Sequence, residues 1–207
     1  MKNKKIVMFD FDGVLANTIE YSYKIHKDVN PDFSWESFQA LSNGNFHDGY
    51  NNAVTKGEHI HPKDFYEQYQ NNLEKTNIHE SLFNSIKTLS ENYTLVIVSS
   101  TRSDFIKSFL EREKTLDFFS DIYGADIHKS KVIKIGMILD QYKALPQDCI
   151  FITDTLGDIK EANECNISSI GVTWGLHSSK HMEKGRPMAI IDNPGELVQA
   201  IENVLKS

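Results

Sequence analysis

Near its start the chain carries the stretch Ile6-Val7-Met8-Phe9-Asp10-Phe11-Asp12-Gly13-Val14-Leu15. Its first four residues are apolar and include β-branched side chains, which is typical of a buried strand. Two carboxylates spaced i and i+2 follow, and in an extended chain such side chains point in the same direction. Asp10 and Asp12 are therefore expected to emerge together at the carboxyl end of this strand, where open α/β sheets bind their ligands.

Two carboxylates placed so close together repel each other. Their arrangement calls for a bound cation, a shared proton or a chemical role. The alternative is a plain strand end that is followed by a solvated Asp-Gly turn. A second acidic pair, Asp154 and Asp158, follows the apolar run Cys149-Ile150-Phe151-Ile152-Thr153 and favours a functional interpretation.

The rest of the chain alternates short apolar runs with helical patterns. Such alternation predicts parallel β-α-β units and a doubly wound, Rossmann-like α/β sheet. The expected strands are Lys5–Phe9, Thr94–Val98, Ile122–Gly124, Ile150–Thr153, Ser169–Val172 and Met188–Ile191. The expected helices are Ser81–Leu89, Ser103–Leu110, Lys131–Leu139 and Pro194–Leu205.

One region, from about Thr18 to Asn77, contains no convincing buried strand. We interpret residues 18–77 as a small all-helical cap inserted after the first strand, and residues 1–17 and 78–207 as the α/β core. The alternative is that these helices simply cover one face of the sheet. The region is rich in aromatic residues: Tyr21, Tyr23, Phe33, Trp35, Phe38, Phe46, Tyr50, Phe65, Tyr66 and Tyr69.

Composition narrows the class of protein. The chain has 207 residues, 40% hydrophobic content and a formal net charge of -7, which argues against binding to nucleic acid or to an anionic membrane surface. Its two cysteines, Cys149 and Cys165, lack metal-ligand spacing and fit a reducing compartment. The basic start, Met1–Lys5, precedes an apolar run too short for a signal peptide. We expect a cytoplasmic monomer or homodimer.

The second acidic pair suggests a metal ion. Hard divalent cations such as Mg²⁺ take oxygen ligands, often one or two carboxylates together with phosphate and water. Asp154 is placed to be a direct ligand, and Asp158 lies one helical turn later. The alternative for Asp158 is that it only caps the helix that follows.

Two further segments are suited to holding a phosphate. The strand Thr94–Val98 ends in Ser99-Ser100-Thr101-Arg102, where hydroxyls and backbone N–H groups could form a cradle or merely cap a helix. The segment His128-Lys129-Ser130-Lys131 precedes a helix and supplies an ammonium for an acidic site. Periodicity does not determine whether Lys129 or Lys131 points inward.

Together these motifs resemble those of the haloacid dehalogenase-like superfamily. The segment Asp10-Phe11-Asp12-Gly13-Val14-Leu15 is similar to its first motif, D-x-D-G-[TV]-[LI], and the hydroxyl, the lysine and the D-x-x-x-D pattern follow in the family's order. The tail, with Gly171–Gly175 and Ile190–Leu197, resembles the phosphoglycolate phosphatase-like branch. Two positions depart from the pattern: Thr153 where the family often has Gly, which we expect to be tolerated, and Asn17-Thr18 near the expected hinge.

The resemblance implies a role for each matching residue. Asp10 is the nucleophile that forms an aspartyl-phosphate, and Asp12 is the general acid/base, whose backbone carbonyl joins Asp10 and Asp154 around Mg²⁺. Asp158 supports the metal site. Ser99, with Ser100 beside it, binds the transferring phosphoryl group, and Lys131 or Lys129 steadies that group.

The expected function is therefore Mg²⁺-dependent hydrolysis of a small phosphorylated metabolite. Because halide leaves without protonation, Asp12 favours phosphate ester chemistry over dehalogenation. A phosphomutase of the β-phosphoglucomutase kind and a non-catalytic binding module remain the alternatives. In the cap, Asn43, Asn45, His47 and Asp48 are candidate substrate contacts, with an ordinary connecting loop as the alternative; His59 and His61 are interpreted as a surface loop rather than a metal site.

Overall fold

The computed structural model describes residues 5–58 and 62–206 of the chain. The pair His59 and His61, interpreted above as a surface loop, lies outside the described residues. Within the described ranges, no helix combines the length and the apolar character needed to cross a bilayer.

The core of the molecule is a six-stranded parallel sheet with the order β3-β2-β1-β4-β5-β6. This confirms the doubly wound α/β class, and each strand matches its predicted range to within one residue at either end. The strands are β1 (Ile6–Phe9), β2 (Thr94–Val98), β3 (Asp121–Tyr123), β4 (Cys149–Thr153), β5 (Ser168–Val172) and β6 (Ala189–Ile191).

Helices cover both faces of this sheet, because successive side chains of a strand point to opposite sides. In β1, Val7 and Phe9 pack in one apolar cluster with α5, α6 and α10, while Ile6 and Met8 pack in the other with α7 and α8. The bounds are α5 (Glu80–Asn92), α6 (Ser103–Arg112), α7 (Lys131–Tyr142), α8 (Leu156–Glu164), α9 (Ser179–Met182) and α10 (Leu197–Lys206), with short 3₁₀ turns at Leu116–Phe118, Pro146–Asp148, Glu183–Gly185 and Pro194–Glu196.

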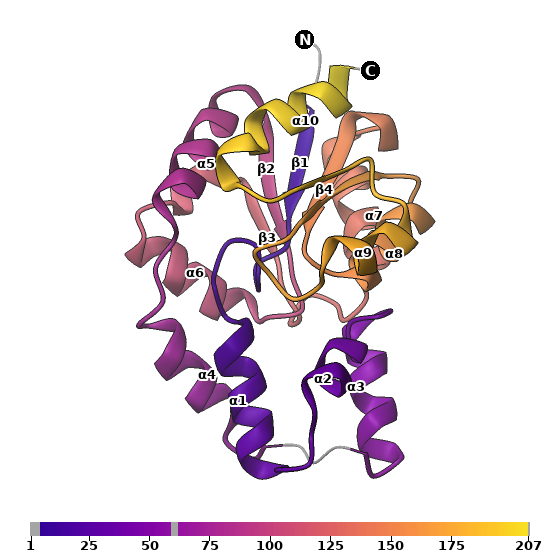
Figure 1. The fold of residues 1–207 in the computed structure, drawn as a ribbon. Helices are drawn as coiled ribbons and strands as arrows, with labels where there is room; N and C mark the ends of the chain where they lie inside the picture. The colour runs from indigo at the N-terminus through magenta and orange to yellow at the C-terminus, as the bar shows by residue number, and fades with distance from the viewer. Residues whose placement is uncertain (1–4, 59–61, 207) are drawn as a thin grey trace.

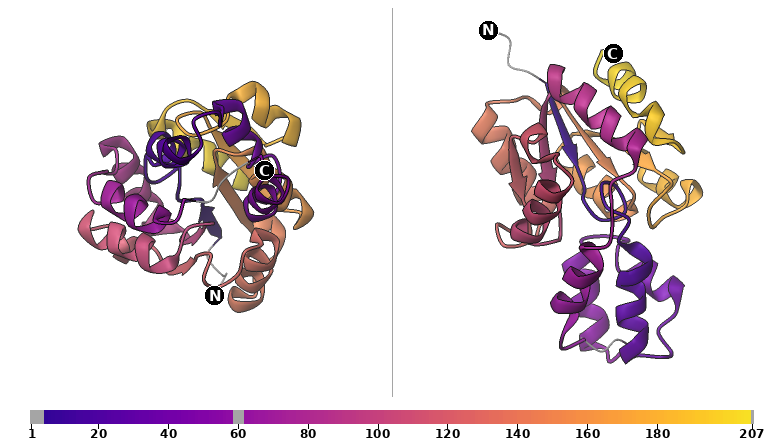
Figure 2. Two further views of the ribbon diagram at one scale, coloured as in Figure 1. Left: turned by 90° about the horizontal axis from the view of Figure 1, so that it is seen from below. Right: turned by 90° about the vertical axis from the view of Figure 1, so that its left-hand side faces the viewer.

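Four further helices lie beyond the carboxyl ends of the strands instead of against either face of the sheet (Figures 1 and 2). We call α1 to α4 the cap helices; α1, α2 and α3 pack around an aromatic cluster that includes Phe33 and Phe38, while Tyr69 and Leu73 of α4 belong to a cluster of the core. The exact domain bounds, 18–77 for the cap, stay a prediction. The cap helices are α1 (Ile19–Val29), α2 (Trp35–Ala40), α3 (Phe46–Thr55) and α4 (Phe65–Leu73).

The strand order places the site. The chain runs outward from β1 through β2 to β3, then crosses to β4 on the other side of β1 and runs outward to β6, so β1 and β4 flank the switch point at which open α/β sheets bind ligands. Phe9 pairs with Ile152 across this point, and the backbone N–H of Asp10 donates to the carbonyl of Ile152 at 2.9 Å. The residues that follow β1 and β4 are thereby brought side by side.

Candidate active site

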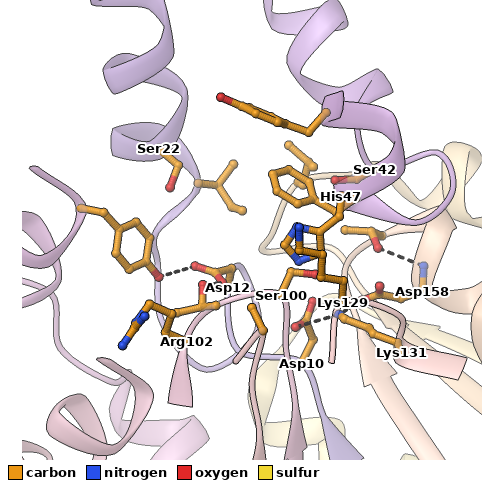
Figure 3. Close-up of a pocket in the computed structure, with 18 of the residues that line it drawn as sticks. Asp10, Asp12, Ser22, Ser42, His47, Ser100, Arg102, Lys129, Lys131 and Asp158 are labelled. Carbon is orange, nitrogen blue, oxygen red and sulfur yellow. Dashed lines mark hydrogen bonds and ion pairs between the residues drawn. The ribbon is translucent and has the colours of Figure 1, made fainter. Parts of the chain in front are cut away.

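The centre of the site is a buried lysine between two buried carboxylates. The Nζ of Lys131 lies 2.9 Å from Oδ1 of Asp10 and 2.6 Å from Oδ2 of Asp158. Figure 3 shows these groups facing one cavity. The backbone N–H of Lys131 is also fixed, since it donates to Glu161 at 3.0 Å. Of the two lysines that the sequence left open, Lys131 contacts the acidic pair, while Lys129 is exposed and lines the cavity.

Asp10 is held firmly where β1 ends. Its Oδ1 accepts a 2.8 Å hydrogen bond from the backbone N–H of Phe11, and only 5% of the residue is exposed. Burial raises the pKa of Asp10 well above its ordinary value, the nearby Lys131 opposes that shift, and the charges of Asp158 and Asp154 add to it. The carboxyl group therefore needs positive charge beside it in order to ionise fully.

Asp154 presents an oxygen with no partner. It is 0% exposed, and its Oδ2 accepts from the backbone N–H of Leu176 at 2.7 Å. Its Oδ1, by contrast, is buried and has no hydrogen-bond partner among the described residues. Burial raises the pKa of Asp154 to about 7. A buried acceptor without a donor is costly, so this oxygen calls for a ligand.

Two glycines make room for the Asp154 carboxyl group. A Cβ atom on Gly13, whose φ is +72°, would lie 2.1 Å from its Oδ2, and one on Gly175 would lie 2.2 Å away. Any other residue at either position would displace the side chain. The close approach of backbone to this carboxylate therefore explains Gly13 in the Asp-Gly turn that follows Asp12.

The oxygen atoms gathered here fit a hard divalent cation. Three carboxyl groups are buried here, those of Asp10, Asp154 and Asp158, and the buried ammonium of Lys131 pairs with two of them, Asp10 and Asp158. The hydrogen bonds of the loop that follows β1 join Phe11, Gly13 and Ala16 and do not use the carbonyl of Asp12. Within residues 5–58 and 62–206, no cluster of three or more His, Cys, Asp or Glu side chains forms a metal site alone. The arrangement thus suits an ion that takes the carboxylates of Asp10 and Asp154, the backbone carbonyl of Asp12 and further ligands from outside the protein, such as water or phosphate.

Asp158 has a second partner besides Lys131. Its Oδ2 also accepts from the hydroxyl of Thr153 at 2.7 Å, and that hydroxyl in turn accepts from the backbone N–H of Thr155. Burial tends to raise the pKa of Asp158, but Lys131 and the hydrogen bonds outweigh burial and lower it. Direct metal binding by Asp158 stays a prediction. Thr153, where the family often has Gly, is an integral part of this network.

Asp12 is held by three hydroxyl groups. Its Oδ1 accepts from Thr18 at 2.7 Å and from Tyr69 at 2.5 Å, and its Oδ2 accepts from Thr101 at 2.6 Å. Tyr69 lies on cap helix α4, so the cap reaches directly into the site. Thr101 belongs to the hydroxyl cluster expected to cradle a phosphate or cap a helix, and here its hydroxyl donates to Asp12; the contacts of Thr18 and Tyr69 with Asp12 were not predicted. Thr18 lies at the position where the chain departs from the family pattern.

The loop after β2 also holds candidate residues in defined places. Ser99 is 0% exposed, and its Oγ accepts from the backbone N–H of Thr101 at 3.0 Å. Ser100 and Thr101 line the cavity. Lys134, which was not among the predicted site residues, is fully buried and donates to the carbonyl of Ser99 at 2.5 Å. Its position in the sequence could have indicated this burial, because Lys134 lies three residues after Lys131 and is surrounded by apolar residues in the helix.

The candidate cap contacts separate into two groups. His47 lines the cavity, and its Nε2 is buried with no hydrogen-bond partner among the described residues. Asn45 instead donates to Glu161 at 3.0 Å and to the carbonyl of Lys129 at 3.3 Å. Asn43 pairs with His181 at 2.6 Å. The loop around Gly44 thus docks the cap onto the core, and substrate contact by Asn45 stays a prediction.

Comparison with known proteins identifies the family. The family model for haloacid dehalogenase-like hydrolases matches residues 7–172, which include both acidic pairs and the buried lysine. This chain belongs to the haloacid dehalogenase-like hydrolase family. The resemblance read from the motifs is therefore confirmed, and so is the expectation of a hydrolase.

Individual members of the haloacid dehalogenase-like family are distant in sequence. The phosphoglycolate phosphatase of Synechococcus elongatus is 20% identical over 208 residues, 97% of this chain and 98% of that protein. The protein named Probable phosphatase IndB of Dickeya dadantii is 28% identical over 119 residues, 56% of this chain and 52% of that protein. A solved structure of a predicted phosphatase from Clostridium acetobutylicum shares the fold, with a TM-score of 0.78, 20% identity, and coverage of 97% and 99% of the two chains.

Proposed function

We propose that this chain is a Mg²⁺-dependent phosphatase that hydrolyses a small phosphate monoester through an aspartyl-phosphate on Asp10. The observation that carries the proposal is the 2.9 Å ion pair between Asp10 and the buried Lys131, beside the unpaired oxygen of Asp154. Membership of the hydrolase family and relatives named as phosphatases support it.

In the first step a carboxylate oxygen of Asp10 attacks phosphorus, and the bond from phosphorus to the ester oxygen breaks. Asp12 gives its proton to the departing alkoxide, which leaves as the alcohol. In the second step a water molecule loses its proton to Asp12 and attacks the same phosphorus. The acyl phosphate bond then breaks, which releases inorganic phosphate and restores Asp10.

The site supplies positive charge for the incoming phosphate. Lys131 offsets the repulsion between the Asp10 carboxylate and the phosphoryl oxygens, and Asp158 keeps the ammonium in place. Mg²⁺ would be held by Asp10, Asp154 and the carbonyl of Asp12, and when bound it would neutralise charge on the transferring phosphoryl group. We assign the phosphoryl contact to Ser99 and to the neighbouring Ser100.

The decisive experiment is phosphate release from p-nitrophenyl phosphate by the purified protein, with and without Mg²⁺. We expect release only with Mg²⁺, and none from Asp10→Asn; the exposed Asp140, changed to Asn, serves as the matched control and should retain activity. Hydroxylamine, which cleaves acyl phosphates, should trap the intermediate on the wild-type protein. Full activity in Asp10→Asn would contradict the assignment of the nucleophile.

The fate of the intermediate separates hydrolysis from the phosphomutase alternative. A phosphatase transfers the phosphoryl group of Asp10 to water, so inorganic phosphate accumulates in step with the alcohol. A mutase returns that group to a sugar phosphate, so little phosphate is released when a sugar monophosphate is the substrate. We expect stoichiometric release of phosphate.

A further inference from the structure

The cavity between the cap helices and the ends of the strands has an aromatic wall. It encloses about 380 Å³ and is lined on the cap side by Phe46, Tyr50, Phe65, Tyr66 and Tyr69, while Asp10, Asp12 and Lys131 lie on the core side. Ligand pockets of this size commonly combine an apolar wall with a few polar groups that fix orientation. The phosphoryl site therefore opens into a space suited to an apolar leaving group.

Several of these rings are arranged in a stack. Phe105 of α6 and Tyr69 lie 6.2 Å apart with an angle of 22° between their planes. Tyr69 and Phe65 follow at 5.8 Å and 26°, and Phe65 and His26 at 5.0 Å and 23°. Because these rings face one another and all line the cavity, they offer it their edges, and an edge-to-face contact is one that another planar ring favours.

The cap side of the cavity carries no fixed charge among the residues that the structure describes. Its polar members are Ser22, His26, Ser42, His47 and Asn51, and none is an acid, a lysine or an arginine. Burial, together with the nearby lysines, lowers the pKa of His47 to about 4, so this ring is neutral at pH 7. A carboxylate placed against this wall would lose its hydration without gaining a counter-ion.

The cations on the core side of the cavity do not make its lining positive. Lys131 is already shared between Asp10 and Asp158. Arg102 lines the cavity but donates two hydrogen bonds, of 3.0 and 2.9 Å, to the carboxylate of Asp104. Lys129 is exposed and lines the cavity, but the carboxyl groups of the lining outnumber its cations: Asp10, Asp12, Asp126, Asp154 and Asp158 against Arg102, Lys129 and Lys131. A negatively charged leaving group therefore meets a lining in which carboxyl groups outnumber cations.

The size of the cavity points in the same direction. The volume of about 380 Å³ lies within the range of ~300–1,000 Å³ that is usual for ligand pockets. A phosphoryl group with a two-carbon acid attached would leave most of this space unfilled. A six-membered ring on a short linker would use the space and contact the aromatic wall.

We infer that the substrate is a phosphate monoester of an uncharged alcohol that carries a flat aromatic or heteroaromatic ring. This inference rests on the proposed function and narrows it to one class of leaving group. The ring lies between the cap helices, against the aromatic wall at Phe65 and Tyr66, and the phosphoryl group lies at Asp10 and Lys131. The inferred substrate differs from phosphoglycolate, the small acidic ester that the name of the Synechococcus relative specifies.

The test uses four esters that differ only in ring and charge. Benzyl phosphate has a ring and an uncharged leaving group, 4-carboxybenzyl phosphate adds a carboxylate, ethyl phosphate lacks the ring, and phosphoglycolate lacks the ring and carries the carboxylate. All four release an alkyl alcohol, so the chemistry of departure is comparable. We expect kcat/KM for benzyl phosphate to exceed that for each of the others by about tenfold or more, since burial of several apolar carbons is worth that factor.

A matched pair of variants on α3 tests the charge argument. Asn51 and Asn52 are adjacent and both exposed, but only Asn51 lines the cavity. Asn51→Lys places a cation in the cap wall and should raise kcat/KM for 4-carboxybenzyl phosphate relative to benzyl phosphate by about fivefold. Asn52→Lys adds the same charge outside the cavity and should leave the wild-type ratio unchanged.

A second pair of variants tests the aromatic wall. Tyr66 is 56% exposed, so truncating it should leave the fold intact. Tyr66→Ala should lower the ratio of benzyl to ethyl phosphate turnover, and Tyr66→Phe should keep that ratio. An unchanged ratio in Tyr66→Ala would remove the ring of Tyr66 from the inferred contact surface.

The outcomes separate this inference from the proposed function. Equal or better turnover of phosphoglycolate or of 4-carboxybenzyl phosphate overturns the inference and leaves the phosphatase assignment standing. Turnover of p-nitrophenyl phosphate, with no turnover of any of the four alkyl esters, likewise overturns the inference and leaves the phosphatase assignment standing. If none of the five esters is hydrolysed in the presence of Mg²⁺, the proposed function is contradicted, and the inference with it.

Discussion

The hydroxyl of Tyr69 donates a 2.5 Å hydrogen bond to Oδ1 of Asp12, which lies 57 residues earlier in the chain. Tyr69 belongs to cap helix α4, and Asp12 belongs to the loop that follows β1. The position of the proposed general acid/base therefore depends on where the cap sits. Burial, followed by the charge of Asp12, raises the pKa of Tyr69 well above its ordinary value, so the hydroxyl remains a donor.

Loss of this hydrogen bond should slow the step that Asp12 assists. In Tyr69→Phe we expect kcat/KM for an alkyl phosphate to fall by about 10- to 100-fold, because general acid catalysis depends on a well-placed proton. For p-nitrophenyl phosphate, whose leaving group needs little protonation, the fall should be smaller. Steady-state kinetics with both esters measure the difference.

Tyr21 offers a control for this substitution. Its ring lies 5.6 Å from the ring of Tyr69, and its buried hydroxyl has no hydrogen-bond partner among the described residues. Tyr21→Phe should thus leave both rates close to those of the wild type. An equal loss for both esters in Tyr69→Phe would indicate a general structural defect instead of a misplaced acid.

Removing the buried ammonium should destabilise the fold as well as abolish activity. In Lys131→Met the carboxyl groups of Asp10 and Asp158 lose the partner that lies 2.9 and 2.6 Å away. Leaving a buried charge uncompensated costs about 3–5 kcal/mol. Urea denaturation at pH 7 measures the change in the free energy of unfolding. Adding Asp158→Asn should restore part of the loss, and no recovery would contradict the charge argument.

Metal binding should be measurable without turnover. After treatment with EDTA, adding Mg²⁺ should raise the free energy of unfolding, by about 2.7 kcal/mol at 100 times the dissociation constant. Asp154→Asn should abolish this gain, because its unpaired Oδ1 is the proposed ligand. Asp117 is exposed and does not line the cavity, so Asp117→Asn should keep the gain. A wild-type protein insensitive to Mg²⁺ would rule out the assigned site.

The buried Lys134 should make stability depend on pH in the alkaline range. Burial, followed by the charge of Lys131, lowers the pKa of Lys134 to about 8. Between about pH 8 and the ordinary lysine value near 10.4, the unfolded chain binds this proton more strongly than the folded chain. Folding stability therefore rises with pH across that window, by at most about 3 kcal/mol from this group.

The comparison with Lys134→Met isolates that contribution from other titrating groups. The difference in unfolding free energy, wild type minus variant, should increase between pH 7 and pH 10. Guanidinium denaturation at several pH values measures it. Lys87 is exposed, so the corresponding difference for Lys87→Met should stay flat. A flat difference for Lys134→Met would mean that the buried amine keeps an ordinary pKa.

The sequence by itself determined the sheet and the acidic residues of the site that follow β1 and β4. Apolar runs and helical periodicity predicted the strands to within one residue at either end, because a parallel sheet buried on both faces requires continuous apolar segments. The acidic residues that follow β1 and β4 were identifiable because their spacing and position are local properties. Since parallel strands end at one edge of the sheet, Asp10 and Asp154 had to meet there.

Only the tertiary structure decided between Lys129 and Lys131, because no local pattern says which of two lysines at the start of a helix is turned inward; Lys131 is the first residue of α7, and Lys129 precedes its N-cap. It alone brought Tyr69 to Asp12 and Lys134 to Ser99. These contacts join segments far apart in the chain, and the local sequence of each segment does not indicate which distant segment it contacts. Packing of the cap over the strand ends determines them, so they emerge only when the whole chain is folded.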